Sequence, residues 1–79
     1  VIVKPGMPYL DIIRCVKDKF KIPVIAYQVS GEYSLLKNGI NKKIIDEKSI
    51  IESLISFKRA GACSIISYFA DTINLDLLN

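Results

Sequence analysis

The fold is decided by the opening stretch of the chain, Val1-Ile2-Val3-Lys4-Pro5-Gly6-Met7-Pro8. Three β-branched residues followed by Pro-Gly are typical of a short buried strand that stops at a turn. Pro8 can then occupy the first turn of a helix, where its missing N–H donor does no harm. The sequence therefore predicts a strand over Val1–Lys4 that leads directly into a helix.

The helix predicted after this turn is amphipathic and about three turns long. Asp11 lies near its start, where a negative charge suits the helix dipole. The residues that repeat with helical spacing are the apolar Leu10, Ile13, Val16 and Phe20, while Arg14, Lys17 and Asp18 can face water.

Two more strands are predicted further along the chain. Ile22–Val29 is apolar and rich in β-branched residues, with Pro23 at its start, where proline does least harm to a strand. Ser30-Gly31 ends this run, and Cys63–Phe69 is interpreted as the third strand.

The segments between and after these strands are predicted to be helical. A short helix over Glu32–Lys37 is expected to close at Asn38-Gly39. A longer helix follows, with Asp46 as its N-cap and Gly61 as its left-handed end. A last short helix is expected over Asp71–Asn79. The apolar stripe of the longer helix consists of Ile50, Ile51, Leu54, Ile55 and Phe57.

Alternation of strand and helix indicates an α/β fold built from parallel βαβ units. The carboxyl ends of parallel strands meet at one edge of a sheet, so Lys4, the Tyr27–Ser30 segment and Tyr68 are expected to converge there. Ligands bind at that edge both in doubly wound sheets and in (β/α)8 barrels.

Lys4 is the candidate nucleophile. Desolvation at the end of a buried strand can lower the pKa of a lysine and leave an amine that forms a Schiff base with a ketone. Pro5 favours an extended Lys4, and Gly6 allows a ligand or a neighbouring loop to approach closely. The alternative is that Lys4 only extends to solvent from a strand end.

Hydroxyl groups at the other strand ends could hold a carboxylate. Tyr27, Ser30 and Tyr68 supply them, and the amides at a helix start could add donors. The alternative is ordinary, since tyrosines often flank strands and Ser-Gly is a common turn. Glu32 is predicted to be structural, as a first-turn residue matched to the helix dipole. Asp46 and Glu47 are better explained as capping groups than as a catalytic pair.

Composition bounds the possible partners and compartment. The formal charge is +3, and the lysines are scattered rather than clustered with aromatics, which argues against nucleic-acid binding. Apolar runs are much shorter than the ~20 residues of a membrane helix, so no membrane association is expected. Cys15 and Cys63, with no histidine in the chain, are predicted to be reduced and non-catalytic, which fits the cytoplasm. An opening on Val1 without a methionine suggests a piece of a longer polypeptide.

Four blocks resemble consecutive blocks of the porphobilinogen synthase (5-aminolevulinate dehydratase) family, in order and in spacing. They are Val3–Asp11, Ala26–Tyr33, Lys58–Ala62 and Ser67–Ala70. The resemblance implies that residues 1–79 are the carboxyl-terminal portion of one (β/α)8 barrel domain, with its last three strands and helices. It also implies condensation of two 5-aminolevulinate molecules to porphobilinogen with loss of water, in tetrapyrrole and haem biosynthesis.

The resemblance also implies roles for single residues. Lys4 matches the lysine that forms the Schiff base with the substrate on the propionate side of the product. Ser30 and Tyr68 match residues that hydrogen-bond the carboxylate of that substrate, and Tyr27 matches a tyrosine lining the same pocket.

Other parts of a family enzyme have no counterpart in these 79 residues. They are the second lysine, the metal segment that holds zinc or magnesium, and the active-site lid. The whole enzyme is expected to form a homo-octamer, and the 79 residues alone are expected to be inactive.

Two other readings remain open from the residues themselves. A class I Schiff-base aldolase would share the chemistry of Lys4 but not the block from Tyr27 to Tyr33. A small non-catalytic α/β binding module would be complete as it stands. Upstream sequence for about five more βα units would support the barrel, whereas a start codon at Val1 would support the module.

Overall fold

The computed structural model describes residues 1–70. The helix predicted over Asp71–Asn79 lies outside the described residues. In the described part, the elements alternate between strand and helix as the sequence predicts.

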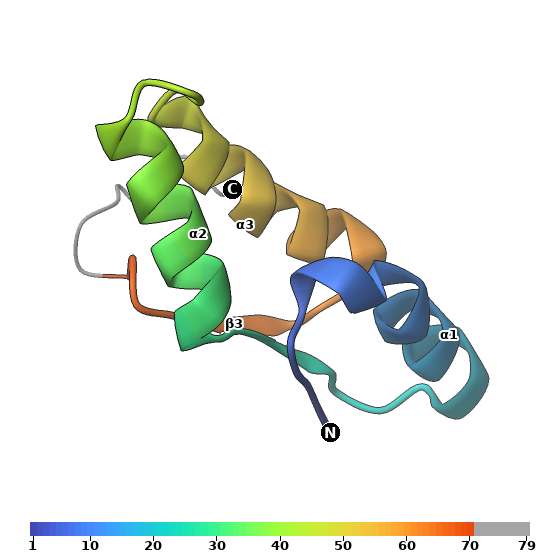
Figure 1. The fold of residues 1–79 in the computed structure, drawn as a ribbon. Helices are drawn as coiled ribbons and strands as arrows, with labels where there is room; N and C mark the ends of the chain where they lie inside the picture. The colour runs from blue at the N-terminus through green and yellow to red at the C-terminus, as the bar shows by residue number, and fades with distance from the viewer. Residues whose placement is uncertain (71–79) are drawn as a thin grey trace.

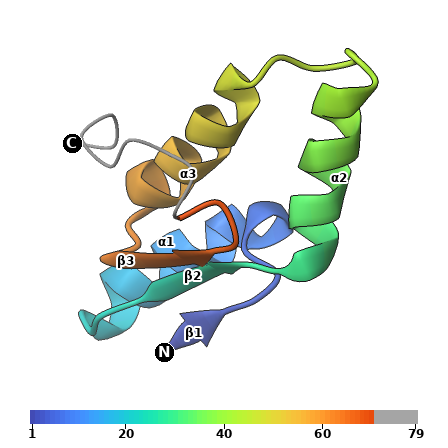
Figure 2. The same ribbon diagram turned by 90° about the vertical axis from the view of Figure 1, so that its left-hand side faces the viewer.

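Three parallel strands form one sheet in the order β1-β2-β3. They are shorter than predicted: β1 covers Ile2–Val3, β2 covers Ile25–Gln28 and β3 covers Ser64–Ser67. Ala26 on the central strand is level with Val3 on one side and Ile65 on the other. Figure 2 shows the strands side by side, with α2 rising from the end of β2.

The first crossover confirms the predicted proline-started helix. A 3-10 turn, η1, covers Met7–Tyr9 with Pro8 at its start, and α1 follows over Leu10–Phe20. Ile13 is fully buried, whereas Phe20 at the last position is 59% exposed, so the prediction that Phe20 belongs to the buried stripe is wrong. The chain turns at Lys21, which has a left-handed conformation (φ 52°).

The second crossover consists of two helices, and its first helix is longer than predicted. α2 covers Ser30–Asn41 and continues through Asn38 and Gly39, which were expected to end it. The Asn38 side chain donates a hydrogen bond to the Ser34 carbonyl inside the helix (2.8 Å). Gly39 instead lies close to the loop after α2, because a Cβ there would be 3.0 Å from the Ile45 side chain, which is a tight contact.

The second of these helices, α3, covers Lys48–Ala60 and begins and ends close to the predicted residues. Glu47 precedes the helix without a side-chain cap, but the Asp46 carboxylate accepts a hydrogen bond from the Lys48 amide (2.8 Å). Gly61 ends the helix with φ 116°, as predicted for a left-handed terminator.

The core lies between the sheet and two helices, α1 and α3, which lie side by side in Figure 1. The buried residues that form this core are Val3, Ile13, Val24, Ala26, Leu54 and Phe57. Removing their apolar side chains from water contributes the main stabilisation of the fold. Arg14 on α1 also donates a hydrogen bond to the Arg59 carbonyl at the end of α3 (2.7 Å), which joins the two helices.

The opposite face of the sheet is open in the described structure. Side chains alternate between the two faces of a strand, so Ile2 and Ile66 point away from the core. They are 51% and 43% exposed. The two faces of the sheet therefore have different environments, and only one is covered by helices of residues 1–70.

Candidate functional site

The candidate residues lie just beyond the strands, at one edge of the sheet. Lys4 follows β1, Ser30 follows β2 after a single residue, and Tyr68 directly follows β3. Tyr27 lies within β2, level with Ile66. Because the three strands are parallel, their carboxyl ends meet at this edge, as the sequence predicts.

Three of these residues also share the open face of the sheet. Counting in steps of two along each strand places Lys4 with Ile2 and Tyr68 with Ile66. Tyr27 lies between Ala26 and Gln28, which are both fully buried toward the helices. The candidate chemistry therefore lies on the side that the core does not occupy.

Lys4 is exposed, and its side chain makes no hydrogen bond or ion pair with another residue of 1–70. The sequence predicted that Lys4 would be desolvated at the end of its strand, but residues 1–70 do not bury its side chain. The Lys4–Pro5 peptide bond is cis, and the chain turns there into Gly6. A Cβ at Gly6 would lie 2.7 Å from the Phe57 ring, so the close neighbour that requires glycine is a core side chain.

The structure brings Tyr27 and Tyr68 together. A hydrogen bond between their side chains, assisted by the charge interaction between them and by slight desolvation, raises the pKa of Tyr68 above 10.0. The Tyr68 ring also packs against Tyr33 of α2, with ring centroids 5.6 Å apart. No role was predicted for Tyr33 from the sequence. Its position one helical turn after Ser30 would have placed the two residues on the same face of the helix.

Ser30 is the first residue of α2 and is exposed. Its hydroxyl makes no hydrogen bond to another described residue, so it remains available to a ligand. The space beside the next residue is also open, because a Cβ at Gly31 would meet no atom within 4 Å. The start of α2 can therefore present a hydroxyl and helix amides to an anion.

Glu32 joins the turn after β1 to the turn after β2. Its carboxylate accepts hydrogen bonds from the amides of Met7 (2.8 Å), Val29 (3.0 Å) and Gly6 (3.2 Å). Glu32 is structural, as predicted, but two of its three donors belong to a distant turn rather than to its own helix. These two donors lie outside the helix, so matching a carboxylate to the helix dipole does not predict them.

A second polar connection, between β2 and β3, was not found from the sequence. Gln28 is fully buried, and its amide donates to the Ser53 hydroxyl on α3 (2.9 Å). The Ser67 hydroxyl donates to the Gln28 carbonyl oxygen (2.6 Å) and accepts from the Phe69 amide (3.1 Å). These bonds fix the backbone on both sides of Tyr68.

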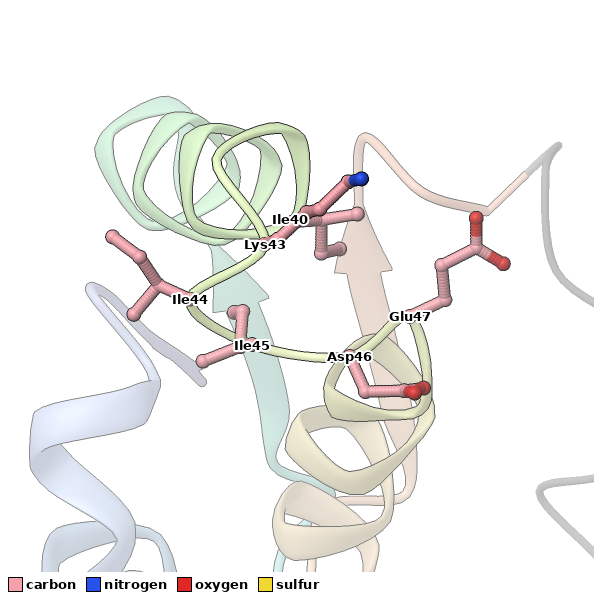
Figure 3. A pocket seen from close by; sticks show the side chains of 6 residues that line it. All are labelled: Ile40, Lys43, Ile44, Ile45, Asp46 and Glu47. Carbon is pink, nitrogen blue, oxygen red and sulfur yellow. The ribbon is translucent and has the colours of Figure 1, made fainter.

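Two surface hollows of the described chain lie away from these residues. One, of about 420 Å³, is lined by Ile40, Lys43, Ile44, Ile45, Asp46 and Glu47 of the loop between α2 and α3. Figure 3 shows the Asp46 and Glu47 carboxylates pointing in different directions, which argues against a catalytic pair. Asp46 caps the helix as predicted, whereas the prediction that Glu47 is a capping group is wrong, because its side chain makes no cap hydrogen bond. Another, of about 400 Å³, lies at the end of α1 between Lys17 and Ile22.

A metal centre is not built by residues 1–70. No group of three or more His, Cys, Asp or Glu side chains in this range could hold a metal ion. Cys15 and Cys63 are free and exposed. None of the helices described here is long and apolar enough to cross a membrane.

Comparison with known proteins now assigns the family. The sequence profile of the family described as delta-aminolevulinic acid dehydratase matches residues 1–75. The chain belongs to this family. The dehydratase of Methanothermus sociabilis is 58% identical over 73 residues, which are 92% of this chain and 23% of that protein. The chloroplastic dehydratase 1 of Arabidopsis thaliana is 56% identical over 89% of this chain and 16% of its own length.

A solved dehydratase has the same arrangement of elements. The crystal structure from Toxoplasma gondii, in complex with the reaction product porphobilinogen, superposes with a TM-score of 0.87 at 47% sequence identity. The match covers 90% of this chain and 20% of that chain. The three parallel strands and their crossover helices are thus a piece of the dehydratase TIM barrel, and the chain spans about a fifth of the relatives that it matches.

Proposed function

We propose that this chain is part of a porphobilinogen synthase, which condenses two molecules of 5-aminolevulinate. Residues 1–79 would form the carboxyl-terminal portion of its single barrel domain. The observation that carries this proposal is the position of Lys4, Ser30 and Tyr68 after three neighbouring parallel strands. In a dehydratase barrel this edge is where catalytic groups gather.

Lys4 is proposed to form the Schiff base. Its amine adds to the ketone of one 5-aminolevulinate, water leaves, and an imine links the substrate to the protein. The exposed Lys4 side chain supports this role, because it makes no hydrogen bond or ion pair with another described residue. Since the relatives extend well beyond this chain, the desolvation that favours a free amine is assigned to other parts of the barrel.

Ser30 and Tyr68 are proposed to bind the carboxylate of that substrate, and Tyr27 to line the same pocket. Their support is the accessibility of the two groups: the Ser30 hydroxyl makes no hydrogen bond to another described residue, and Tyr68 is exposed just beyond β3. Hydroxyl donors and the amides at the start of α2 suit an anionic group.

The other properties of the whole enzyme follow from the family. We propose a zinc or magnesium ion whose ligands are not among residues 1–70, and we assign no step to it. A homo-octamer is proposed, with no nucleic acid or membrane partner. Two free cysteines favour a reducing compartment, proposed to be the cytoplasm, although plant relatives are chloroplastic.

The 79 residues by themselves are proposed to be inactive. β1 and β3 each pair with β2 on one side only, so two strand edges have no partner in the described sheet. Experiments on function therefore require the full-length enzyme.

Borohydride trapping tests the role of Lys4 in that enzyme. With 5-aminolevulinate present, reduction of the imine should attach the substrate to the Lys4 peptide, which peptide mass spectrometry detects. Lys4→Arg should abolish both labelling at this position and turnover, because guanidinium stays protonated and cannot form an imine. Label found only on other lysines, or near-normal turnover of Lys4→Arg, would refute the assignment.

A further inference from the structure

The Glu32 carboxylate connects two turns that are far apart in the sequence. Gly6 and Met7 follow Lys4, and Val29 precedes Ser30, yet all three backbone amides donate to this one side chain. Glu32 is partly buried and has no ion-pair partner among residues 1–70. Its charge is therefore stabilised by charge-assisted hydrogen bonds from three backbone amides and by the start of α2.

The turn that Glu32 holds is fixed by other contacts as well. The Gly6 amide also donates to the Tyr27 carbonyl (2.9 Å). The Phe57 ring occupies the space where a Gly6 side chain would lie. The turn after Lys4 therefore packs against β2 and α3, and Glu32 holds it near the start of α2.

Matching the helix dipole does not require this arrangement. A first-turn glutamate that served only its own helix would need Val29 as its partner and nothing beyond. Two of the three donors instead come from 25 and 26 residues earlier in the chain. The Glu32 carboxylate thus fixes the position of the turn after Lys4 relative to the turn before Ser30.

We propose that Glu32 is a positioning residue that sets the separation between the Lys4 amine and the Ser30 hydroxyl, so that the site selects keto acids by the spacing of ketone and carboxylate. This inference rests on the proposed function, in which Lys4 takes the ketone and Ser30 the carboxylate. A substrate held at both ends must match the distance between the two groups. One added methylene would then disturb either the imine or the carboxylate contacts.

The test measures chain-length preference in the full-length enzyme. Levulinate has the same ketone-to-carboxylate spacing as 5-aminolevulinate, and its homologue with one more methylene between these groups provides the comparison. Inhibition constants for both are measured with wild type, Glu32→Gln and Glu32→Asp. Glutamine keeps the length but loses the charge and one acceptor, whereas aspartate keeps the charge but is too short to bridge the turns.

The matched control is Asp46→Asn. Asp46 also accepts a hydrogen bond from a backbone amide at a helix start, that of Lys48, but it joins no second turn in the described structure. Both Glu32 variants should lose the preference for levulinate over the longer acid by about tenfold or more, as expected for loss of one charge-assisted hydrogen bond. Asp46→Asn should keep that preference even if its melting temperature falls.

The outcomes separate this inference from the proposed function. If wild type forms no imine at Lys4, the proposed function fails. If wild type forms the imine and both Glu32 variants keep its chain-length preference, the inference fails and the function stands. If Glu32→Gln does not fold, Glu32→Asp decides alone, because it retains a charged carboxylate at the start of α2.

Discussion

The two faces of the sheet differ in what surrounds them. Toward α1 and α3, Ala26 and Phe57 are fully buried. On the other face, Ile2 is 51% exposed and Tyr68 is 53% exposed. The stabilising contacts of this segment and its candidate chemistry thus lie on opposite sides of the same strands, so substitutions on the two sides should have separable effects.

The largest effect on stability is expected on the helix-covered face. Phe57→Ala would leave a cavity between α3 and the turn at Gly6, at a cost of about 3–5 kcal/mol in the free energy of unfolding. Urea unfolding of the full-length enzyme measures the loss. Phe20→Ala is the matched control, because Phe20 is exposed at the end of α1 and its removal should cost about 0.5 kcal/mol or less. Equal losses for the two variants would contradict the described core.

Substitutions on the open edge should weaken ligand binding and leave stability nearly unchanged. Ser30→Ala and Tyr68→Phe should each weaken inhibition by levulinate by about 10- to 150-fold, which is roughly 1.5–3 kcal/mol for a hydrogen bond to a charged group. Inhibition by methyl levulinate should change less, because the ester lacks the charge. Inhibition constants of the full-length enzyme provide the measurement.

The control for this edge is Ser64→Ala. Ser64 is also exposed, but it lies at the amino end of β3, away from the converging strand ends. Its loss should leave both inhibition constants unchanged. Equal weakening for acid and ester in the Ser30 and Tyr68 variants would show that these hydroxyls serve the fold or the ketone, and the carboxylate assignment would be withdrawn.

The sequence alone was sufficient to predict strands and helices whose signals lie in neighbouring residues. The parallel strands, the helices that became α1 and α3, and the left-handed end at Gly61 are all confirmed. Their signals lie within a few neighbouring residues, such as Pro8 at a helix start. The edge at which Lys4, Ser30 and Tyr68 follow the strands could be predicted for the same reason, since it needs only strand order and direction.

Features that depend on distant partners could not be predicted in this way. Gly39 was interpreted as a helix end, but it lies inside α2 and is packed against the side chain of Ile45 from the following loop. That contact could not be read from neighbouring residues. The donors to Glu32 lie on another turn, and the buried Gln28 depends on partners from two other elements. Such contacts exist only after the chain has folded, so they leave no periodic trace in the sequence.

The smallest expected effect concerns the pair of tyrosines on the open face. The hydrogen bond that the Tyr68 hydroxyl donates to Tyr27, together with the charge interaction between the two side chains, raises the pKa of Tyr68 above 10.0, so the folded protein keeps the Tyr68 proton to a higher pH than the unfolded chain. This contribution to stability is fully present below pH 10 and is lost as the pH rises through the folded pKa. Tyr27→Phe should therefore move the Tyr68 titration back toward 10.0, as followed by NMR of tyrosine labelled at the ring carbon that bears the hydroxyl. Tyr33→Phe is the matched control, because Tyr33 contacts the same ring through its own ring, at 5.6 Å between centroids. If both variants shift the titration equally, ring packing rather than the hydrogen bond governs Tyr68.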